Sequence, residues 1–562
     1  MNRPSQPEPT EPTAAEQSVA DAADAAEGTA GSADRRQSES ASALSRRSFV
    51  GGALGGALVG AVGGVALARV TPLGRTARRV AARSVPDARP VSVPASTTTL
   101  PPMSGPTWQM GASEIAERIR TGEVSSREVI DEHLARIAEV NGSVNAVTVV
   151  LEETARAAAD HADNQRARGT TVGPLHGVPF TVKENIDLIG TATTWGLSAF
   201  QKLLPTNDAP HIVQLKRAGA IPIARTNLPD LAFRWSTDNA LHGPTTNPWD
   251  RSRTAGGSSG GDAVALATGM TPLGMGNDVF GSLRVPAQFC GVTSLRPTLG
   301  RIAQVSDTHV ELPIGFQLMA VQGPLARHVA DLRLAFASMS GDDARDPWWT
   351  PAPFNGRPLP KRVAVHTGGA SPQVAAGIAK AADAMSDAGY DVKELTAPMI
   401  EQAADIAQDI IASDSQVLVD PVRPFISQDG LNFIDTWIRL RPSLDKAAYV
   451  QALTNRLVIA RAWDEFQLHH PLILGPVSTK PPFVVGRDLE GHAAIAELFD
   501  TMRFVVVVNL LGLPSVTVPV GVSNGLPQAV QLIGPRYRED LCLNAAEAIE
   551  HKLGSITPIN PR

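Results

Sequence analysis

Short apolar runs that alternate with helix-like stretches are the feature that most restricts what this chain can fold into. The runs have the length of buried strands and occupy residues 178–182, 221–224, 271–275, 362–365, 472–474, 515–520 and 529–533. Stretches with apolar residues at helical spacing lie among them, for example residues 374–388 and 541–551. Strands that alternate with helices pack as a sheet whose faces the helices cover. The pattern therefore predicts an α/β fold with a largely buried, mixed or parallel sheet.

Some helix boundaries can also be predicted from the sequence. Ser125 and Glu128 form a candidate capping box ahead of apolar residues at helical spacing, which predicts that a helix begins there. Gly389 separates the helix-like stretch 374–388 from a strand-like stretch at 391–395, as a helix stop would. Neither an internal repeat nor a polar, proline-rich linker interrupts residues 107–562. We therefore expect a single domain over that range.

Residues 1–106 have the composition of an export signal and a tether. Residues 1–44 are rich in Ala, Ser, Pro and Glu and have almost no large apolar side chains, so we expect them to be disordered. Paired arginines precede a Gly/Ala/Val run in residues 45–68, which resemble a twin-arginine signal peptide with a small-x-small cleavage pattern at its end. Residues 69–106 are rich in Arg, Pro, Ser and Thr and are predicted to form a linker.

This segment predicts the location of the protein. A cleaved signal implies export by the twin-arginine translocase across the cytoplasmic membrane, to the periplasm, the cell envelope or the medium. An uncleaved membrane anchor is the alternative, because roughly 20 apolar residues can span a bilayer. The glycines in residues 51–68 lower the hydropathy of the run and favour the cleaved signal. An ordinary secretory signal is a third possibility.

Charge and metal-ligating residues exclude several classes of protein. The formal net charge is −6, which gives no indication of a nucleic-acid partner. The two cysteines provide neither a disulfide framework nor a cysteine metal site, and the 12 histidines show no metal-ligand spacing. We expect no metal and no other cofactor.

Two serines in glycine-rich turns and one lysine carry the candidate chemistry. Ser258 lies in a Gly-Gly-Ser-Ser-Gly-Gly segment, Ser282 follows Gly281, and Lys183 follows the apolar run 178–182. The glycine-serine segment alone is typical of a flexible loop, and no Gly-Lys-Ser/Thr follows that would make it a phosphate cradle. Together the three residues can supply a relay, a nucleophile and a base if burial lowers the pKa of the lysine. The combination indicates acyl transfer without histidine.

These segments together resemble the amidase signature family of serine hydrolases, which use a Ser–cis-Ser–Lys triad. The resemblance continues in residues 224–229, 236–239, 243–249, 286–291, 296–301, 512–521 and 526–534. It implies a large twisted mixed β-sheet surrounded by α-helices. It also implies that Ser282 is the nucleophile, that Ser258 is the proton relay preceded by a cis peptide bond, and that Lys183 is the base.

The resemblance implies further roles around the nucleophile. An oxyanion hole would be formed by the backbone N–H groups of Val279, Phe280, Gly281 and Ser282. Asp278 and Arg284 flank this loop and are expected to brace it. The chain departs from the family pattern at Val279 and Phe280, where Thr-Gly is usual, and a side chain at position 280 is expected to reshape the acyl pocket.

Two other departures are Asp262, where a small residue is common, and Arg296, where lysine is common. Neither is expected to touch the triad. Candidate aromatic residues of an acyl pocket are Trp195, Phe200, Trp235 and Phe280, although the core is the commoner place for each type.

The predicted function is that of an amidase, which converts a carboxamide to an acid plus ammonia or amine through a Ser282 acyl-enzyme. One alternative is a glutaminase-type subunit of an amidotransferase, which the export signal disfavours because aminoacyl-tRNA is cytosolic. The other is a catalytically silent binding protein with the same fold. The sequence is compatible with several classes of amide and with esters, and it specifies no oligomeric state.

Overall fold

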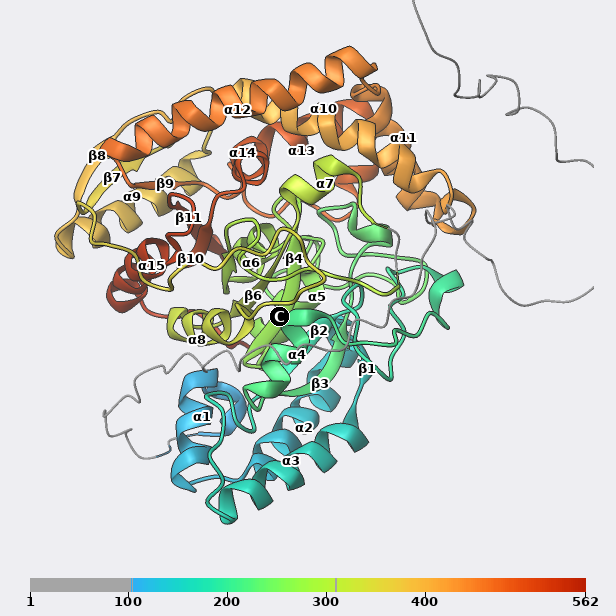
Figure 1. Ribbon diagram of the computed structural model, residues 1–562, viewed down its shortest axis with the longest axis vertical. Helices are drawn as coiled ribbons and strands as arrows, with labels where there is room; N and C mark the ends of the chain where they lie inside the picture. Colours follow the sequence, from blue (N-terminus) through green and yellow to red (C-terminus); the bar gives the residue numbers. More distant parts are fainter. Residues whose placement is uncertain (1–102, 104, 309–310) are drawn as a thin grey trace, which may run out of the picture. The chain divides into compact units, whose positions relative to one another are not determined.

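The apolar runs form one 11-stranded sheet in the computed structural model, which describes residues 103, 105–308 and 311–562 (Figure 1). The strands are β1 Val147–Val150, β2 Pro179–Lys183, β3 Ile221–Thr226, β4 Leu273–Asp278, β5 Thr293–Arg296, β6 Val321–Ala326, β7 Arg362–Val365, β8 Asp391–Glu394, β9 Leu472–Gly475, β10 Ser515–Ser523 and β11 Leu526–Ile533. Each predicted apolar run overlaps one of these strands, and the expected strand after Gly389 is β8.

The strand order across the sheet is β1-β3-β2-β4-β6-β5-β10-β11-β9-β7-β8. Strand β2 pairs in parallel with β3 and β4, and β7 pairs in parallel with β8 and β9. The remaining pairs, which include β4 with β6 and β10 with β11, are antiparallel. The sheet is therefore mixed, and the predicted α/β fold is confirmed.

Three strands were not predicted from the sequence, namely β1, β5 and β6. Strand β5 has the sequence Thr-Ser-Leu-Arg and is buried at every position. Thr293 Oγ1 donates to the carbonyl of Ala326 in the neighbouring strand at 2.9 Å, and the Arg296 guanidinium donates to the carbonyl of Met319 at 3.1 Å. A short strand that buries polar groups lacks both an apolar run and a clear alternation, so its sequence resembles a loop.

Helices cover the sheet and extend beyond it. They are α1 Ala112–Thr121, α2 Ser126–Val144, α3 Glu152–Ala167, α4 Pro210–Arg217, α5 Gly260–Ala267, α6 Arg284–Cys290, α7 Ile314–Met319, α8 Val329–Met339, α9 Pro372–Asp387, α10 Ile400–Val419, α11 Gln428–Leu440, α12 Lys446–His469, α13 His492–Thr501, α14 Arg503–Leu511 and α15 Glu539–Leu553. The capping box predicted at Ser125 and Glu128 is present at the start of α2, where each side chain bonds the backbone N–H of the other residue. Figure 1 shows α1–α3 beside β1–β3 and α10–α13 gathered at the top of the view, where α10 packs against α12 and α14.

The described residues belong to one compact unit, Ser84–Arg562. The expected disordered region 1–44, the signal 45–68 and most of the linker 69–106 lie outside the described residues. Among the helices that the structure describes, none has the length and hydropathy needed to span a membrane.

The candidate site residues lie where the middle of the sheet meets two short buried helices. Helices α5 and α6 are buried at every position, which is consistent with their largely apolar sequences. Each helix begins next to one of the two glycine- and serine-containing turns, and α5 packs against β2 and β4, which pair side by side in the sheet. Buried secondary structure on both sides holds these turns in one conformation.

Candidate active site

Lys183 is the last residue of β2, a strand that is buried along its whole length. The strand is apolar before the lysine and pairs on both sides with parallel neighbours, so Lys183 is carried into the interior rather than to the surface. Its side chain is 0% exposed. The sequence-based expectation of a buried lysine agrees with this position.

The Lys183 side-chain nitrogen contacts two polar side chains. Nζ donates to Ser258 Oγ at 2.7 Å and to Asn277 Oδ1 at 2.8 Å. Asn277 is itself oriented by Asn185, whose Oδ1 accepts a hydrogen bond from Asn277 Nδ2 at 3.0 Å. Because the amide of Asn277 is held in place, it fixes one N–H direction of the lysine and leaves the serine contact for proton transfer.

Burial lowers the pKa of Lys183 to about 7, although the carboxylates of Asp262 and Asp278 oppose that change by favouring the ammonium. Desolvation disfavours a charged amine more strongly than these charges restore it. A lysine with a pKa near neutrality is substantially deprotonated under ordinary conditions and can accept a proton.

Ser258 lies in a turn whose shape depends on glycine. The Gly257–Ser258 peptide bond is cis, as the family resemblance implied. A Cβ on Gly257 would lie 2.4 Å from the carbonyl oxygen of Arg234, so no larger residue fits there without displacement of the backbone. The turn connects to the second serine segment through a hydrogen bond of 3.2 Å from Ser259 N to Ser282 O. The structure therefore brings all three predicted triad residues into one region.

Ser282 lies at the end of the loop between β4 and α6 and is 8% exposed. Its Oγ forms no hydrogen bond to Ser258 Oγ, whereas the Lys183–Ser258 contact is formed. In the described part of the chain, the side chain of Ser282 has no hydrogen-bond partner. A hydroxyl that is partly accessible and unengaged is available to an incoming carbonyl group.

The four backbone N–H groups predicted to form the oxyanion hole are not equivalent. Gly281 N donates to Asp278 Oδ1 at 2.8 Å and is already engaged. Within the described residues, the N–H groups of Val279, Phe280 and Ser282 have no acceptor. These three groups can donate to a negatively charged oxygen, whereas the Gly281 N–H shapes the loop.

Asp278 and Arg284 form a buried ion pair under the loop. Arg284 Nε lies 3.0 Å from Asp278 Oδ2, and both side chains are 0% exposed. Burial alone would raise the pKa of Asp278, but the guanidinium of Arg284 outweighs it and holds the pKa well below its usual range. Asn509 of α14 completes the arrangement by donating to Asp278 Oδ1 at 2.7 Å. Through this network the two charged residues contact the loop that carries Ser282, and their bracing role stays a prediction.

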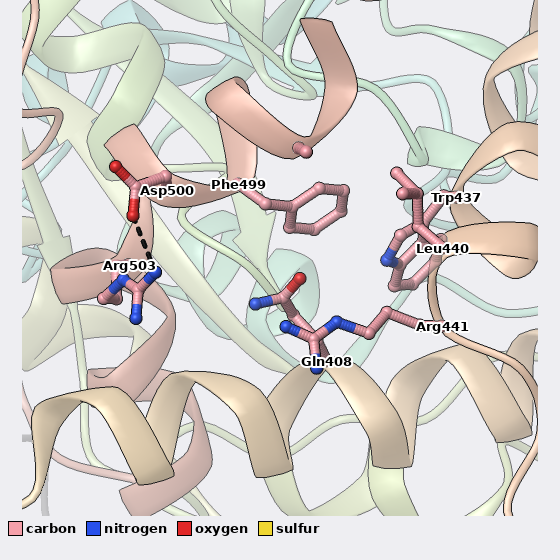
Figure 2. A pocket seen from close by; sticks show the side chains of 8 residues that line it. Gln408, Trp437, Leu440, Arg441, Phe499, Asp500 and Arg503 are labelled. Carbon is pink, nitrogen blue, oxygen red and sulfur yellow. Dashed lines mark hydrogen bonds and ion pairs between the residues drawn. The ribbon is translucent and has the colours of Figure 1, made fainter. Parts of the chain in front are cut away.

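Aromatic side chains extend from the loop toward a cavity. Trp235 Nε1 donates to the Phe280 carbonyl at 2.7 Å, and the Phe280 ring meets Trp437 edge to face with ring centroids 6.3 Å apart. Trp437 in turn stacks on Phe499 at 5.4 Å. Figure 2 shows Trp437 and Phe499 in the wall of a cavity of about 400 Å³, with Gln408 below them. Phe280 therefore belongs to an aromatic cluster that reaches this cavity.

The other aromatic candidates are Phe200, Trp195 and Trp235. Phe200 is partly buried, with its ring centroid 6.5 Å from that of Phe425. Trp195 is partly buried and has a positive φ of 54°. Trp235 is a core residue that holds the loop through its indole N–H.

Sequence reasoning missed three polar residues of the site: Asn277, Asn185 and Asn509. Asn277 lies directly before Asp278 in a segment that was recognised, but its partner depends on the register of β2 against β4, where Val182 lies opposite Met275. Asn509 reaches the site from α14, more than two hundred residues further along the chain. Position within a motif could have drawn attention to Asn277, whereas no local signal indicates Asn509.

Asp262 and Arg296 were expected not to touch the triad, and neither forms a hydrogen bond to Lys183, Ser258 or Ser282. The negative charge of Asp262 nevertheless acts on Lys183 through space, which the sequence did not indicate. In the described ranges, no group of three His, Cys, Asp or Glu side chains is arranged to hold a metal ion.

Comparison with known proteins places this geometry in a family. The family model described as Amidase matches residues 128–543. An indoleacetamide hydrolase of Bradyrhizobium diazoefficiens is 42% identical over 462 residues, which cover 80% of this chain and 88% of that protein. One of the subunits of a glutamyl-tRNA(Gln) amidotransferase of Synechococcus is 31% identical over 78% of this chain and 96% of its own length.

The solved structures agree with these sequence relatives. One solved structure superposes on this chain with a TM-score of 0.71 at 30% identity. It is a chain of a vestigial protein complex that reveals the evolutionary origins of an s-triazine catabolic enzyme. The match covers 80% of this chain and 100% of that one. The similarity thus extends over the mixed sheet and the helices that surround it.

Proposed function

Because the chain belongs to the amidase family, we propose that it hydrolyses a primary amide of the arylacetamide type through an acyl-enzyme on Ser282. The observation that supports this most is the buried hydrogen bond of 2.7 Å between Lys183 Nζ and Ser258 Oγ, next to the accessible hydroxyl of Ser282. It provides a base, a relay and a nucleophile in one region. The family membership makes amide hydrolysis the activity, and the contacts of these residues support the proposed steps.

In the first half of the reaction, Ser282 Oγ attacks the amide carbonyl carbon. As the new C–O bond forms, the serine proton passes to Ser258 Oγ while the Ser258 proton passes to neutral Lys183. The carbonyl oxygen becomes an oxyanion. Collapse of the tetrahedral intermediate breaks the C–N bond, and the leaving nitrogen takes the proton back from the lysine through Ser258 and departs as ammonia. Hydrolysis of the acyl-enzyme repeats these steps with water as the nucleophile.

The oxyanion is stabilised by backbone donors that need no reorganisation. Val279, Phe280 and Ser282 offer N–H groups without an acceptor among the described residues, and Gly281 is held by Asp278 so that the loop keeps its shape. Fixed donors of this kind contribute about 3–4 kcal/mol each to transition-state stabilisation in serine hydrolases.

The proposed acyl group is aromatic. Phe280 belongs to a cluster with Trp437 and Phe499, so flat, apolar side chains lie beside the nucleophile loop. Planar rings pack against such a surface edge to face or in offset stacks. The 42% identical relative is named for an amide that carries an indole ring, and this ring is planar and aromatic.

A panel of amides tests this proposal. Purified protein is incubated with indole-3-acetamide, phenylacetamide, acetamide and glutamine, and ammonia release is measured for each. We expect the two aryl amides to give the largest kcat/KM, and Ser282→Ala to remove the activity. Turnover of acetamide above that of both aryl amides would contradict the aromatic acyl group while leaving amide hydrolysis intact.

A glutaminase-type function is the second candidate, since one relative at 31% identity is part of an amidotransferase. A protein with this function would release ammonia from glutamine in preference to aryl amides. The same panel separates the two functions. A non-catalytic binding protein would release no ammonia from any substrate and would not react with a fluorophosphonate probe at Ser282.

We also propose that the protein is exported by the twin-arginine translocase, which the sequence of residues 45–68 supports. Replacement of Arg46 and Arg47 by lysine is expected to leave the protein in the cytoplasm. The wild type is expected outside the cytoplasmic membrane with a new N-terminus near Arg69. Export of the double variant at the wild-type rate would contradict the proposal, and export with residues 45–68 retained would favour the anchor.

A further inference from the structure

Asp262 is a buried acid that the proposed reaction does not use. It lies in the first turn of α5, four residues after Ser258, and is 0% exposed. Its Oδ1 accepts a hydrogen bond of 3.0 Å from Thr181 Oγ1. A carboxylate in such a place is costly unless a positive charge acts on it.

The structure has room for this carboxyl group only because a neighbouring residue is small. A Cβ on Gly274 of β4 would lie 3.0 Å from Asp262 Cβ and 3.1 Å from Oδ1. Thr181 and Lys183 are two residues apart on β2, so both side chains leave the same face of the strand. Since Thr181 bonds Asp262, that face is the one toward which the carboxyl group lies.

Two cations act on Asp262, namely Lys183 and Arg225. Neither forms a hydrogen bond to it. Lys183 donates to Ser258 and Asn277, whereas Arg225 of β3 donates to backbone carbonyl oxygens, such as that of Ile186 at 2.8 Å. The carboxylate and the ammonium therefore interact through space, inside a region from which water is excluded.

The other acid that acts on the lysine is already paired. Asp278 of β4 is held by Arg284 of α6, and Arg296 of β5 acts on it as well. Of the two acids that act on Lys183 in the described part of the chain, Asp262 is thus the one without a bonded arginine.

We propose that Asp262 is a positioning residue for the base, whose buried negative charge stabilises the ammonium form of Lys183 and so sets the pH above which the lysine can accept a proton. The inference rests on the proposed function, in which Lys183 is the base. It accounts for the presence of an acid where the family commonly has a small residue. Burial raises the pKa of Asp262 itself, so the two groups titrate as a pair.

The sign of the effect gives a clear test. An anion close to an amine favours the protonated amine, so removal of the anion makes the lysine easier to deprotonate. We therefore expect the ascending limb of kcat/KM against pH to move to lower pH by about one unit in Asp262→Asn. Below the wild-type midpoint, this variant should retain on the order of fivefold more of its own plateau rate than the wild type does.

Two further variants separate charge from structure. Asp262→Glu restores the carboxylate and is expected to return the midpoint toward that of the wild type. Thr181→Val removes one of the hydroxyls that stabilise the anion, since Thr226 also acts on it. This variant should move the limb to lower pH by a smaller amount, which keeps the inference testable if Asp262→Asn fails to fold. Thr293→Val is the matched control, because Thr293 is a buried threonine of β5 whose hydroxyl bonds a backbone carbonyl of β6.

The rate of Ser282 labelling by a fluorophosphonate probe gives the same pH profile without the deacylation step. Unmoved midpoints in both Asp262→Asn and Thr181→Val, or midpoints at higher pH, would overturn the inference. If Lys183→Arg keeps its activity, the base assignment itself is wrong. If Lys183→Arg is inactive and the Asp262→Asn midpoint does not move, only the role of Asp262 is wrong.

Discussion

Lys183 Nζ lies 2.7 Å from Ser258 Oγ, and both side chains are buried, at 0% and 1% exposure. The contact joins the end of a parallel strand to a glycine-rich turn that follows it by 75 residues. Water cannot compete for this hydrogen bond, so the proton affinity of the lysine is set by its protein surroundings. The pH dependence predicted below follows from this arrangement.

Ser282→Ala is expected to lower kcat by at least about 10⁴-fold, because loss of a nucleophile removes the acyl-enzyme route. The free energy of unfolding should change by less than about 0.5 kcal/mol, since the Ser282 hydroxyl has no side-chain partner among the described residues. Ammonia release and urea unfolding measure the two effects. Activity within a hundredfold of the wild type would show that another residue attacks the amide.

The pH dependence of the wild type follows from the buried lysine. Lys183 accepts a proton only when it is neutral, and its pKa is lowered to about 7, so kcat/KM should rise through that pH and reach a plateau above it. The neutral form is the active one, hence activity is lost as pH falls below the pKa. Lys183→Arg should be as inactive as Lys183→Ala, because arginine stays protonated. A wild-type profile that is flat through neutrality would contradict the assignment.

The buried pair Asp278–Arg284 predicts a large effect on stability. Asp278→Asn leaves the Arg284 guanidinium without its counter-charge and should lower the free energy of unfolding by about 3 kcal/mol. The loop should also lose its shape, because Asp278 accepts from the backbone N–H of Gly281. Urea unfolding measures the change. The double variant Asp278→Asn, Arg284→Met should recover part of the loss, and equal stability of both variants would argue against charge as the cause.

The stability that the Asp278–Arg284 pair contributes depends on pH. The native pKa of Asp278 is depressed, so its contribution to stability is complete above the unfolded value of about 3.9. It is lost as pH falls through the native pKa. The difference in unfolding free energy between the wild type and Asp278→Asn should therefore be constant in the neutral range and shrink below about pH 4. Urea unfolding of both proteins at several pH values measures this difference, and a difference that grows on acidification would contradict the prediction.

Elements of the fold could be predicted from the sequence where residues close together in the chain determine them. The buried strand before Lys183, the capping box of Ser125 and the glycine turn around Ser258 each depend on neighbours in the chain, and their structures agree with expectation. Strand β5 was missed because it has neither an apolar run nor a clear alternation, and the strands that pair with it, β6 and β10, lie elsewhere in the sequence.

In the candidate site, likewise, the contacts between distant segments of the chain could not be predicted. The contact of Lys183 with Asn277 depends on the register between two parallel strands, which the pattern of either strand by itself does not specify. The effect of Asp262 on the lysine was missed because its charge acts through space on a residue of β2, a distant segment of the chain. Asn509 comes from α14, and only the folded arrangement brings it to Asp278.

The last prediction concerns Phe280, which occupies a position where the family usually has glycine. Its ring packs edge to face on Trp437, with centroids 6.3 Å apart, so Phe280→Gly removes one wall of the aromatic cluster and opens space beside the nucleophile. We expect kcat/KM for indole-3-acetamide to fall by about tenfold, because the contact with the ring is lost. Amides with a bulkier or branched acyl group should gain relative to it.

The ratio of kcat/KM between the aryl amide and a branched-chain amide measures this change independently of active-enzyme content. Phe280→Leu is the matched control, because it keeps an apolar side chain and the backbone restriction but lacks the ring. An intermediate ratio for leucine would assign the effect to the aromatic surface. Equal ratios for all three proteins would show that the acyl group does not contact Phe280, and the aromatic preference would then have to come from other residues. The backbone N–H of position 280 is retained in each variant, so the oxyanion hole does not distinguish them.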